Sequence, residues 1–411
     1  MADHSAVTST NKPDLASPAP ISPAVRIASI DIFRGLTLLV MLFVNELSGV
    51  KGLPWWTYHM PSDVNGMTYV DMVFPAFLFI VGMSIPLALG RRLAKGDSAL
   101  KLLGHVVLRS LSLVVLGFLL ANRGHFDARL TGMSETAWYL AAFTGVFLLW
   151  NSYPRSVSAR LVYVLKGAGL LLLVVLFAMF RSRTPQGAPA WLDLSYCEIL
   201  GLIGWAYLGV ASLYLLLRKR IWTLPVALVV LVALNALSTA NRLPGPSGFW
   251  NIWPFEAGLC SMPMAGVVAS LIFFEKGVAD SLRDKARFAL VYAAVLFVAG
   301  LLLLPLGVSK NHDTPTWCLF DAAADTVLFL ALYWIADVRH RTNWAAFVKP
   351  AGSNTLLTYL LPDVWYSIPF LAAIGGRWGQ GWPGVVWALA FTAVILGLSA
   401  LLTRAKLRLQ L

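Results

Sequence analysis

The stretch that decides the fold of this 411-residue chain covers residues 29–85: "SIDIFRGLTLLVMLFVNE" (29–46), then "GLPWWTYHMPSDV" (52–64), then "NGMTYVDMVFPAFLFIVGMSI" (65–85). The first and last parts contain apolar runs of about 20 residues, and each run is long enough to cross about 30 Å of hydrocarbon as a helix. The middle part is a short aromatic loop with one histidine, His59. The stretch therefore predicts two membrane-spanning helices and the loop that joins them.

The rest of the chain continues this pattern. It is 58% hydrophobic and 13% charged, with a mean hydropathy of +0.72, whereas soluble domains are about half apolar and a quarter charged. Unpaired backbone polar groups are too costly in lipid, which favours helices. We therefore predict an all-α, polytopic bundle of about twelve membrane-spanning helices. The predicted segments are 30–49, 67–89, 102–121, 134–150, 161–180, 198–217, 221–239, 258–274, 288–306, 317–336, 352–371 and 382–403.

The distribution of Lys and Arg predicts the orientation. Of these 32 residues, 22 lie in the N-terminal tail and in the loops on one side, and eight lie in the loops on the other side. Basic loops stay in the cytoplasm, so we expect both termini to be cytoplasmic and His59 to lie outside. A net charge of +12 can indicate nucleic-acid binding, but topology accounts for this excess. No nucleic-acid partner is expected.

The N-terminus and the cysteines give further limits. Residues 1–24 are rich in Ser, Pro and Ala and lack an apolar core, so we interpret them as a disordered tail rather than a signal peptide. Residues 25–411 then form one membrane domain. The three cysteines lie far apart and have no metal-type spacing, which predicts neither a disulfide framework nor a metal site.

Carboxylates gather on the predicted outer side. Intramembrane carboxylates are costly and usually face a polar cavity, although each can instead accept hydrogen bonds at a helix end. Asp321 and Asp325 are four residues apart and should share one helix face. Together the acids predict an outward-facing acidic cavity for a polyhydroxy or amine-bearing ligand. The seven outer acids are Glu46, Asp71, Glu198, Glu256, Asp321, Asp325 and Asp363, and the substrate-binding candidates among them are Asp71, Glu46, Glu256, Asp321 and Asp325.

The imidazole of His59 suits acid–base chemistry. An unperturbed imidazole accepts and donates protons near neutrality, so such a group can act as a general base toward a hydroxyl or amine. Beside a thioester it can also attack and carry an acyl group briefly. The side-chain amide of Asn45, in the outer part of the first span, can donate to the oxyanion of a tetrahedral intermediate. The alternative is an interfacial loop histidine that caps a helix or bonds a backbone carbonyl.

The opening residues also carry a family resemblance. "SIDIFRGLTLLVMLFVNE", "WWTYH" and "NGMTYVDMVFPAFLFIVGMSI" resemble the opening of the heparan-α-glucosaminide N-acetyltransferase family. That family's pattern is about D-x-F-R-G, then F-V-N, a loop histidine, and W-N-G-x-x-x-x-D-x-V-F-P-x-F-x-F-x-x-G. Weaker matches follow in family order: "EILGLIGWAYL" (198–208), "FEAGL" (255–259), "SKNHDTPTW" (309–317) and "GSNTLLTYL" (352–360). The resemblance covers most of the chain.

The resemblance implies a function and a set of site residues. Proteins of this family are transmembrane acyltransferases that pass acetyl from cytosolic acetyl-CoA to the amine of a terminal glucosamine across the membrane. It implies that His59 is the catalytic histidine and Asn45 its partner. It also implies that Asp31, Arg34 and Asn354 belong to the structural signature and that Asp71 belongs to the active site. A homodimer in the lipid membrane, without a metal, is implied too; an acetyl-histidine intermediate and direct transfer both stay open.

This chain departs from the family pattern in four places, two of which are an Asn45-to-His59 spacing lengthened around Leu53–Pro54 and "PFEAG" in place of a D-P-E-G stretch. Segment 134–180 supplies two spans where the animal enzyme passes almost directly to the next helix, so we expect a two-helix insertion in a ten-helix family core. The family's Gln-Arg pair at the start of the sixth span is Glu198-Ile199 here. We therefore expect an envelope or catabolic sugar, acetylated on nitrogen or oxygen at a bacterial inner membrane, rather than heparan sulfate.

Two other functions fit parts of the pattern. A transporter or flippase for a sugar or lipid-linked sugar would use the acids as proton relays. It predicts broken helices and commonly a repeat; Pro75, Pro86 and Pro362 permit breaks, but the sequence has no strong internal repeat. An acyltransferase of the membrane family that O-acetylates surface polysaccharides would share the chemistry but differ in its signature residues. Neither accounts as directly for a lone histidine between aromatics.

Overall fold

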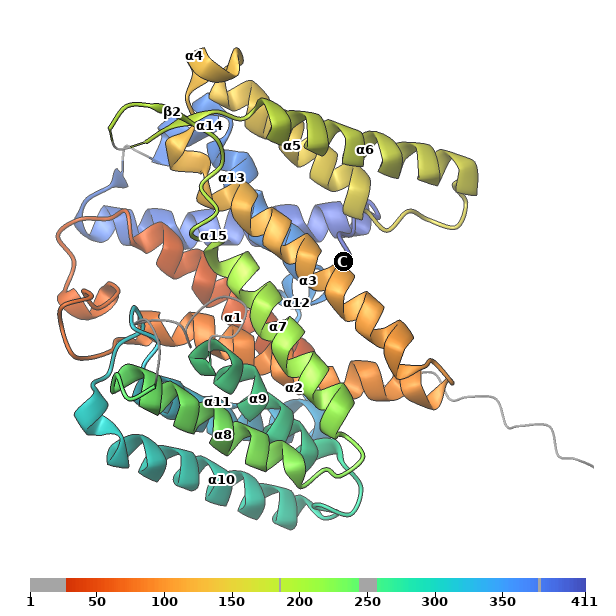
Figure 1. Cartoon of the computed structure of the whole chain (residues 1–411), viewed down its shortest axis with the longest axis vertical. Helices are drawn as coiled ribbons and strands as arrows, with labels where there is room; N and C mark the ends of the chain where they lie inside the picture. The colour runs from red at the N-terminus through yellow and green to blue at the C-terminus, as the bar shows by residue number, and fades with distance from the viewer. Residues whose placement is uncertain (1–26, 185, 244–256, 376–377) are drawn as a thin grey trace, which may run out of the picture.

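The computed structural model describes residues 27–184, 186–243, 257–375 and 378–411. Figure 1 shows the chain as an elongated bundle of helices. The helices are α1 (Ala28–Leu47), α2 (Val73–Ala94), α3 (Ala99–Ala121), α4 (Ala128–Thr131), α5 (Glu135–Trp150), α6 (Ala159–Met179), α7 (Glu198–Leu217), α8 (Thr223–Thr239), α9 (Ala257–Phe274), α10 (Leu282–Leu302), α11 (Pro315–Tyr333), α12 (Lys349–Ser353), α13 (Thr355–Tyr366), α14 (Pro369–Gly375) and α15 (Gly381–Arg404). One short hairpin pairs β1 (Ser182–Arg183) with β2 (Pro189–Ala190).

All twelve predicted segments are helical, which confirms the polytopic helical bundle. Among the described residues, nine helices are long and apolar enough to cross a membrane. The other three segments are α5 with 16 residues, α8 with 17, and a broken pair, α13 and α14, bent by 93°. The continuous span predicted over 352–371 is therefore wrong. The break lies at Ser367 and Ile368, before Pro369, whereas Pro362 stands inside α13; a residue that precedes proline is disfavoured in the α conformation, which suits a break at Ile368.

The centre of the bundle is α9, whose most apolar window is 94% buried. It packs closely on α2 through two glycines. A Cβ atom at Gly82 would overlap the backbone carbonyl of Pro263, and one at Gly266 would overlap the carbonyl of Phe79. Small residues let helix backbones approach closely in membranes, where packing rather than the hydrophobic effect drives association.

The segment predicted as an insertion, 134–180, forms a hairpin of α5 and α6 at the periphery (Figure 1). Only 17% of the most apolar window of α6 is buried, against 94% for α9. α5, by contrast, buries Trp138, Tyr139 and Phe143 in the core of the bundle.

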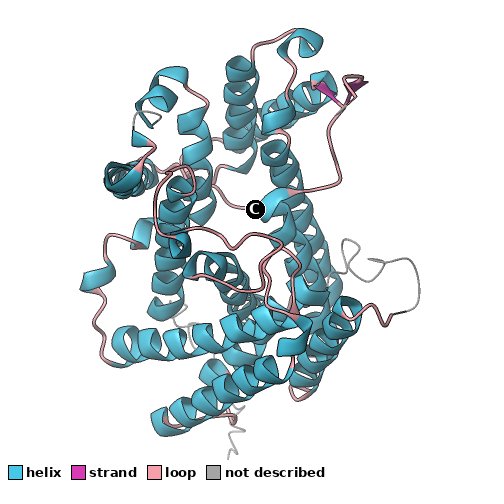
Figure 2. Cartoon of the chain, turned by 90° about the vertical axis from the view of Figure 1, so that its left-hand side faces the viewer, coloured by secondary structure: helices cyan, strands magenta, loops and turns pink. Residues whose placement is uncertain are grey.

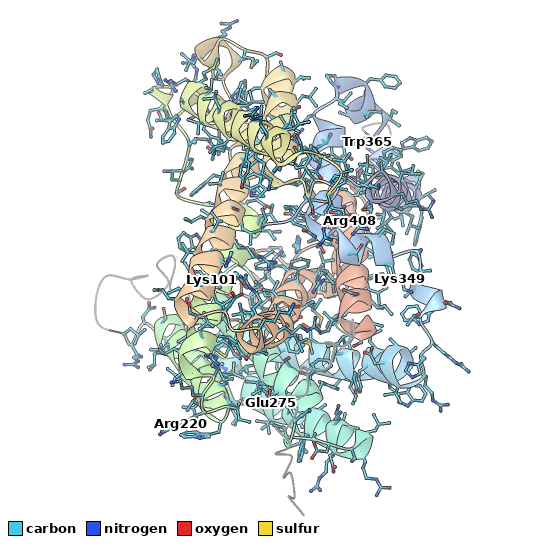
Figure 3. The ribbon with its side chains drawn as sticks, turned by 90° about the vertical axis from the view of Figure 1, so that its right-hand side faces the viewer. Lys101, Arg220, Glu275, Lys349, Trp365 and Arg408 are labelled. Carbon is cyan, nitrogen blue, oxygen red and sulfur yellow. The ribbon has the colours of Figure 1, made fainter. Side chains whose placement is uncertain are left out.

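The connections between helices divide between two ends of the bundle. The connections 48–72 and 303–314 are joined by a backbone hydrogen bond from Gly66 to Val308, and we call the end that carries them the His59 end. Figure 2 views the molecule from this side. The opposite end, seen in Figure 3, carries Lys101, Arg220, Lys349 and Arg408 from four different parts of the chain; we call it the basic end. Basic residues from distant loops thus gather at one end, as the loop pattern predicted.

Candidate active site

The connection 48–72 holds His59 in a folded loop rather than a free one. Trp55–Thr57 form one turn of 3-10 helix just before it. The hydroxyl of Tyr58 donates to the carbonyl of Val50 at 2.7 Å and accepts from the amide of Leu53 at 3.0 Å. Trp55 and Trp56 remain 67% and 52% exposed. The loop therefore presents His59 beside two exposed aromatic rings at the His59 end.

Asp71 is the partner of His59. It lies in a 3-10 turn, Tyr69–Met72, that precedes α2, and its side chain is 1% exposed. Its Oδ1 is 2.7 Å from Nδ1 of His59, while its Oδ2 accepts from the backbone amides of Thr68 at 2.9 Å and Met60 at 3.2 Å. A carboxylate oxygen accepts, so Nδ1 carries the proton and Nε2 of the neutral ring is left with its lone pair.

Lys310 completes the cluster from the other connection. Its Nζ lies 3.2 Å from Nδ1 and 3.4 Å from Nε2 of His59. Burial lowers the pKa of Lys310, and the nearby carboxylate of Asp71 acts in the opposite direction. In the sequence, Lys310 is one of the eight Lys and Arg residues in the loops of the predicted outer side. The signal that marks it is the segment "SKNHDTPTW" (309–317), which contains it.

Three hydrogen bonds join the two connections, and a fourth joins the start of α11 to the connection 48–72. The amide of Gly66 donates to the carbonyl of Val308 at 2.8 Å, and the amide of Val308 donates to Oδ1 of Asn65 at 2.6 Å. In addition, the Asn311 side chain donates to the carbonyl of Met60 at 3.3 Å, and the Trp317 indole donates to the carbonyl of Asp71 at 3.2 Å. These bonds fix Lys310 relative to His59, although the two are 251 residues apart in sequence.

This arrangement is chemically competent. Asp71 holds the imidazole in one tautomer and stabilises the imidazolium that forms when Nε2 takes a proton, as the carboxylate does in hydrolase triads. The side chain of His59 is 39% exposed, so a substrate can approach it. The cluster can therefore act by general-base or nucleophilic catalysis. Within the described ranges, no three His, Cys, Asp or Glu side chains form a group that could hold a metal.

Asn45 and Glu46 take different surroundings at the end of α1. Asn45 is exposed, and its backbone carbonyl accepts from the hydroxyl of Ser48 at 2.6 Å. Among the described contacts, its side chain has no hydrogen bond to His59. The carboxylate of Glu46 accepts from the Tyr366 hydroxyl at 2.5 and 2.6 Å and from the Trp387 indole at 2.6 Å. Glu46 therefore faces α13 and α15 and not the His59 cluster.

The remaining substrate-binding candidates lie away from the cluster. Asp321 and Asp325 share one face of α11, as their spacing predicted, but they are 0% and 4% exposed. Both oxygens of Asp321 and Oδ2 of Asp325 have no hydrogen-bond partner among the described residues. Such burial leaves them no direct contact with a sugar from solvent in this conformation. Glu256 lies outside the described residues.

The signature residues connect helices to one another. Arg34 forms an ion pair with Asp31, at 3.5 Å, and also donates to Ser84 at 3.0 Å and to the carbonyl of Gly352 at 3.3 Å. The side chain of Asn354 is buried at the start of α13. It donates to the Thr403 hydroxyl and the Leu407 carbonyl and accepts from the Leu409 amide, at 2.9, 2.8 and 3.2 Å. These contacts are structural.

A cavity of about 460 Å³ lies beside these residues. Its lining includes Arg34 and Gln410 toward the basic end and Leu200 and Tyr359 in the interior. The Tyr359 hydroxyl donates to both carboxylate oxygens of Glu198 at 3.1 Å, so the cavity ends near an outer acid. Arg109 also lines it. His59 and Asp71 do not line this cavity in the present conformation.

Comparisons with known proteins agree with the residue pattern. The family model described as "Domain of unknown function (DUF5009)" matches residues 26–250, which is more than half of the chain. A heparan-alpha-glucosaminide N-acetyltransferase of Mus musculus is 45% identical over 144 residues, covering 33% of this chain and 21% of that protein. The protein of the same name from Homo sapiens is 40% identical over 97 residues, covering 24% and 14%. The matches thus span about a fifth or less of these relatives.

Proposed function

Because this chain belongs to the DUF5009 family, and because its relatives are named heparan-alpha-glucosaminide N-acetyltransferases, we propose that it is a transmembrane acetyltransferase. It moves acetyl from acetyl-CoA at the basic end to an amino or hydroxyl group of a sugar at the His59 end. The observation that carries the proposal is the 2.7 Å contact between Nδ1 of His59 and Oδ1 of Asp71, which leaves Nε2 with its lone pair.

The chemistry needs only a neutral imidazole. As general base, Nε2 of His59 takes the proton of the acceptor amine or hydroxyl while that atom attacks the thioester carbonyl. The C–S bond then breaks, and the thiolate receives the proton as free CoA. As nucleophile, Nε2 attacks the thioester carbonyl, the C–S bond breaks and CoA leaves as the thiolate; the sugar amine or hydroxyl then displaces the imidazole from the acetyl carbon and gives up its proton to the thiolate or to solvent. In both routes Asp71 stabilises the imidazolium.

The cavity supports a donor that enters at the basic end. Its 460 Å³ lies in the range of small-ligand sites. Arg34 and Arg109 supply two guanidinium groups, which suit phosphate groups because of their planar arrays of donors. The lining extends from Arg34, in the second turn of α1, to Leu200, in the first turn of α7 in the interior. We propose that a donor bound in this cavity points its acetyl thioester toward the His59 end, where the acceptor binds.

The acceptor side is the loop that carries His59. The exposed rings of Trp55 and Trp56 give rigid, amphipathic contact area for a sugar. We place the protein in a bacterial inner membrane, with the basic end in the cytoplasm, and we propose an envelope or catabolic sugar as acceptor. A homodimer follows from the family resemblance.

One observation, a broken helix, favours a second candidate function, that of a transporter or flippase. The 93° break between α13 and α14 is the kind of broken helix that a sugar transporter or flippase predicts. Three outer acids also contact or lie on α13: Glu198 through Tyr359, Glu46 through Tyr366, and Asp363 itself. A transporter would use these groups rather than His59.

Oriented proteoliposomes separate the two functions. Labelled acetyl-CoA is supplied at the basic end and glucosamine at the His59 end, and both label on sugar and movement of sugar are measured. Acetylated sugar that disappears in His59→Ala supports the acetyltransferase. His125→Ala is the matched control, because His125 is an exposed histidine in another connection. Unmodified sugar that crosses equally well in wild type and His59→Ala would refute the enzyme.

A further inference from the structure

We propose that Lys310 is a catalytic residue whose ammonium stabilises the oxyanion formed when Nε2 of His59 attacks an acyl carbonyl. For the natural donor, this inference rests on the proposed function. For the attack of His59 on any acyl compound, it stands on the geometry of the cluster alone, which allows the two to be tested separately.

The distances place the ammonium where the negative charge develops. Nζ of Lys310 is 3.4 Å from Nε2 of His59. When an acyl carbon is bonded to Nε2, ordinary bond lengths put its oxygen about 2.3 Å from that nitrogen. An oxygen on the side of Lys310 is then within hydrogen-bond reach of Nζ. A charged donor aimed at the developing oxyanion lowers the barrier more than it stabilises the neutral carbonyl.

Hydrogen bonds of the neighbouring residues fix the position of Lys310. Its neighbours are fastened to the His59 connection on both sides, by Val308 at Gly66 and Asn65, and by Asn311 at Met60. The side chain is half-buried between the two connections. A donor held in this way needs little rearrangement when the oxyanion forms, which is the condition for electrostatic catalysis.

The charges around His59 support the assignment. Asp71 and Lys310 contact its ring from opposite connections, whereas His312 bonds the hydroxyl of Ser309 and Asp313 bonds the thiol of Cys318. Asp71 places a negative charge beside the ring, and Lys310 places a positive one. The cation can therefore act by keeping the imidazole neutral, by holding the oxyanion, or by both, and the two effects respond differently to pH.

The assignment replaces an expectation from the sequence. Asn45 was the predicted oxyanion donor, yet its side chain is exposed and has no hydrogen bond to His59 among the described contacts. Lys310 lies within 3.4 Å of both ring nitrogens. The group that can reach an oxygen on an acyl carbon at Nε2 is thus the lysine of the second connection.

Acylation of His59 by diethyl pyrocarbonate tests this without acetyl-CoA or sugar. The imidazole nitrogen bonds one carbonyl carbon of the reagent, the C–O bond to the other half breaks, and the released ethyl carbonate yields carbon dioxide and ethanol. Mass spectrometry follows the rate at His59 across the imidazole titration, about pH 5 to 9, with His125 as an internal reference in each sample. The full-length protein is used in detergent micelles.

The expected result is a lower plateau rate at high pH in Lys310→Met, by about tenfold or more, with Lys310→Arg retaining most of the rate. The control Lys51→Met changes an exposed lysine of the same connection as His59 and should leave the rate unchanged. An equal plateau in wild type and Lys310→Met, with only the midpoint moved, shows that the cation acts on the proton alone and overturns the proposal. Equal losses in Lys310→Arg and Lys310→Met, with normal modification of His125, overturn it too.

The two proposals fail separately. If wild-type proteoliposomes do not acetylate the sugar, the acetyltransferase proposal is refuted, but the result with diethyl pyrocarbonate is unaffected. If the plateau rate of His59 acylation is unchanged in Lys310→Met, the role of Lys310 is refuted. The proposal that His59 acetylates a sugar is unaffected by that result.

Discussion

His59 and Asp71 meet at 2.7 Å between Nδ1 and Oδ1, and the second oxygen of the same carboxylate is bonded to the backbone amides of Met60 and Thr68. One buried carboxylate therefore shapes the loop and orients the ring. This double use ties the geometry of the site to the fold of the connection 48–72, so a change at Asp71 should have both a catalytic and a structural effect.

Asp71→Asn should lower the rate of acetyl transfer by about 10²- to 10⁴-fold, because an amide neither fixes the Nδ1–H tautomer nor stabilises the imidazolium as a carboxylate does. The measurement is kcat in proteoliposomes. The matched control is Asp63→Asn, which changes an exposed acid in the same connection and should leave kcat unchanged. Wild-type kcat in a folded Asp71→Asn protein would remove Asp71 from the mechanism.

Trp317→Phe should weaken the attachment of α11 to the site. The indole is 1% exposed and donates to the carbonyl of Asp71 at 3.2 Å. Phenylalanine keeps an aromatic ring but leaves a buried carbonyl without this donor, which costs about 1–3 kcal/mol. We expect a lower thermal unfolding temperature in detergent, whereas Trp382→Phe, at a tryptophan that is 75% exposed, should have little effect. Equal unfolding temperatures in the two variants would contradict this prediction.

The membrane spans could be predicted from sequence because two physical limits act locally. An apolar run must match the bilayer, and every backbone polar group in it must be bonded within the segment. The break between α13 and α14 could not be predicted in this way, because the apolar run of residues 352–371 continues across it. The spacing of Asp321 and Asp325 likewise predicted a shared face, but spacing does not tell what covers a face, and both proved to be buried.

The site was only half predictable. His59 stands out as a lone loop histidine within a family pattern, and Asp71 belongs to the same pattern. Their contact depends on the turn Tyr69–Met72, whose conformation no periodicity specifies. Lys310 comes from 251 residues further along the chain, so it reaches His59 only through the packing of two connections. The sequence contained the residues but not the tertiary contacts that join them.

Gly82→Ala should destabilise the centre of the bundle. The added Cβ would overlap the backbone carbonyl of Pro263 on α9, and overpacking of a rigid neighbour costs about 1–3 kcal/mol or more. The matched control is Gly104→Ala on α3, where nothing lies within 4 Å of the added atom and helix propensity favours alanine. The yield of folded protein after detergent extraction should fall in the first variant and hold in the second. A full yield of Gly82→Ala would show that α2 and α9 can separate at no cost.

The pH dependence of His59 acylation should carry the signature of Lys310. Burial lowers the pKa of this lysine from its ordinary value, so the ammonium is complete below the lowered pKa and disappears as pH rises through it. The rate should therefore rise as His59 becomes neutral and fall again at a pH below that of an ordinary lysine, near 10.4. In Lys310→Arg the alkaline fall should move to higher pH, because a guanidinium keeps its charge. A rate profile with the same alkaline fall in both proteins would assign that fall to another group and leave Lys310 without a titrating role.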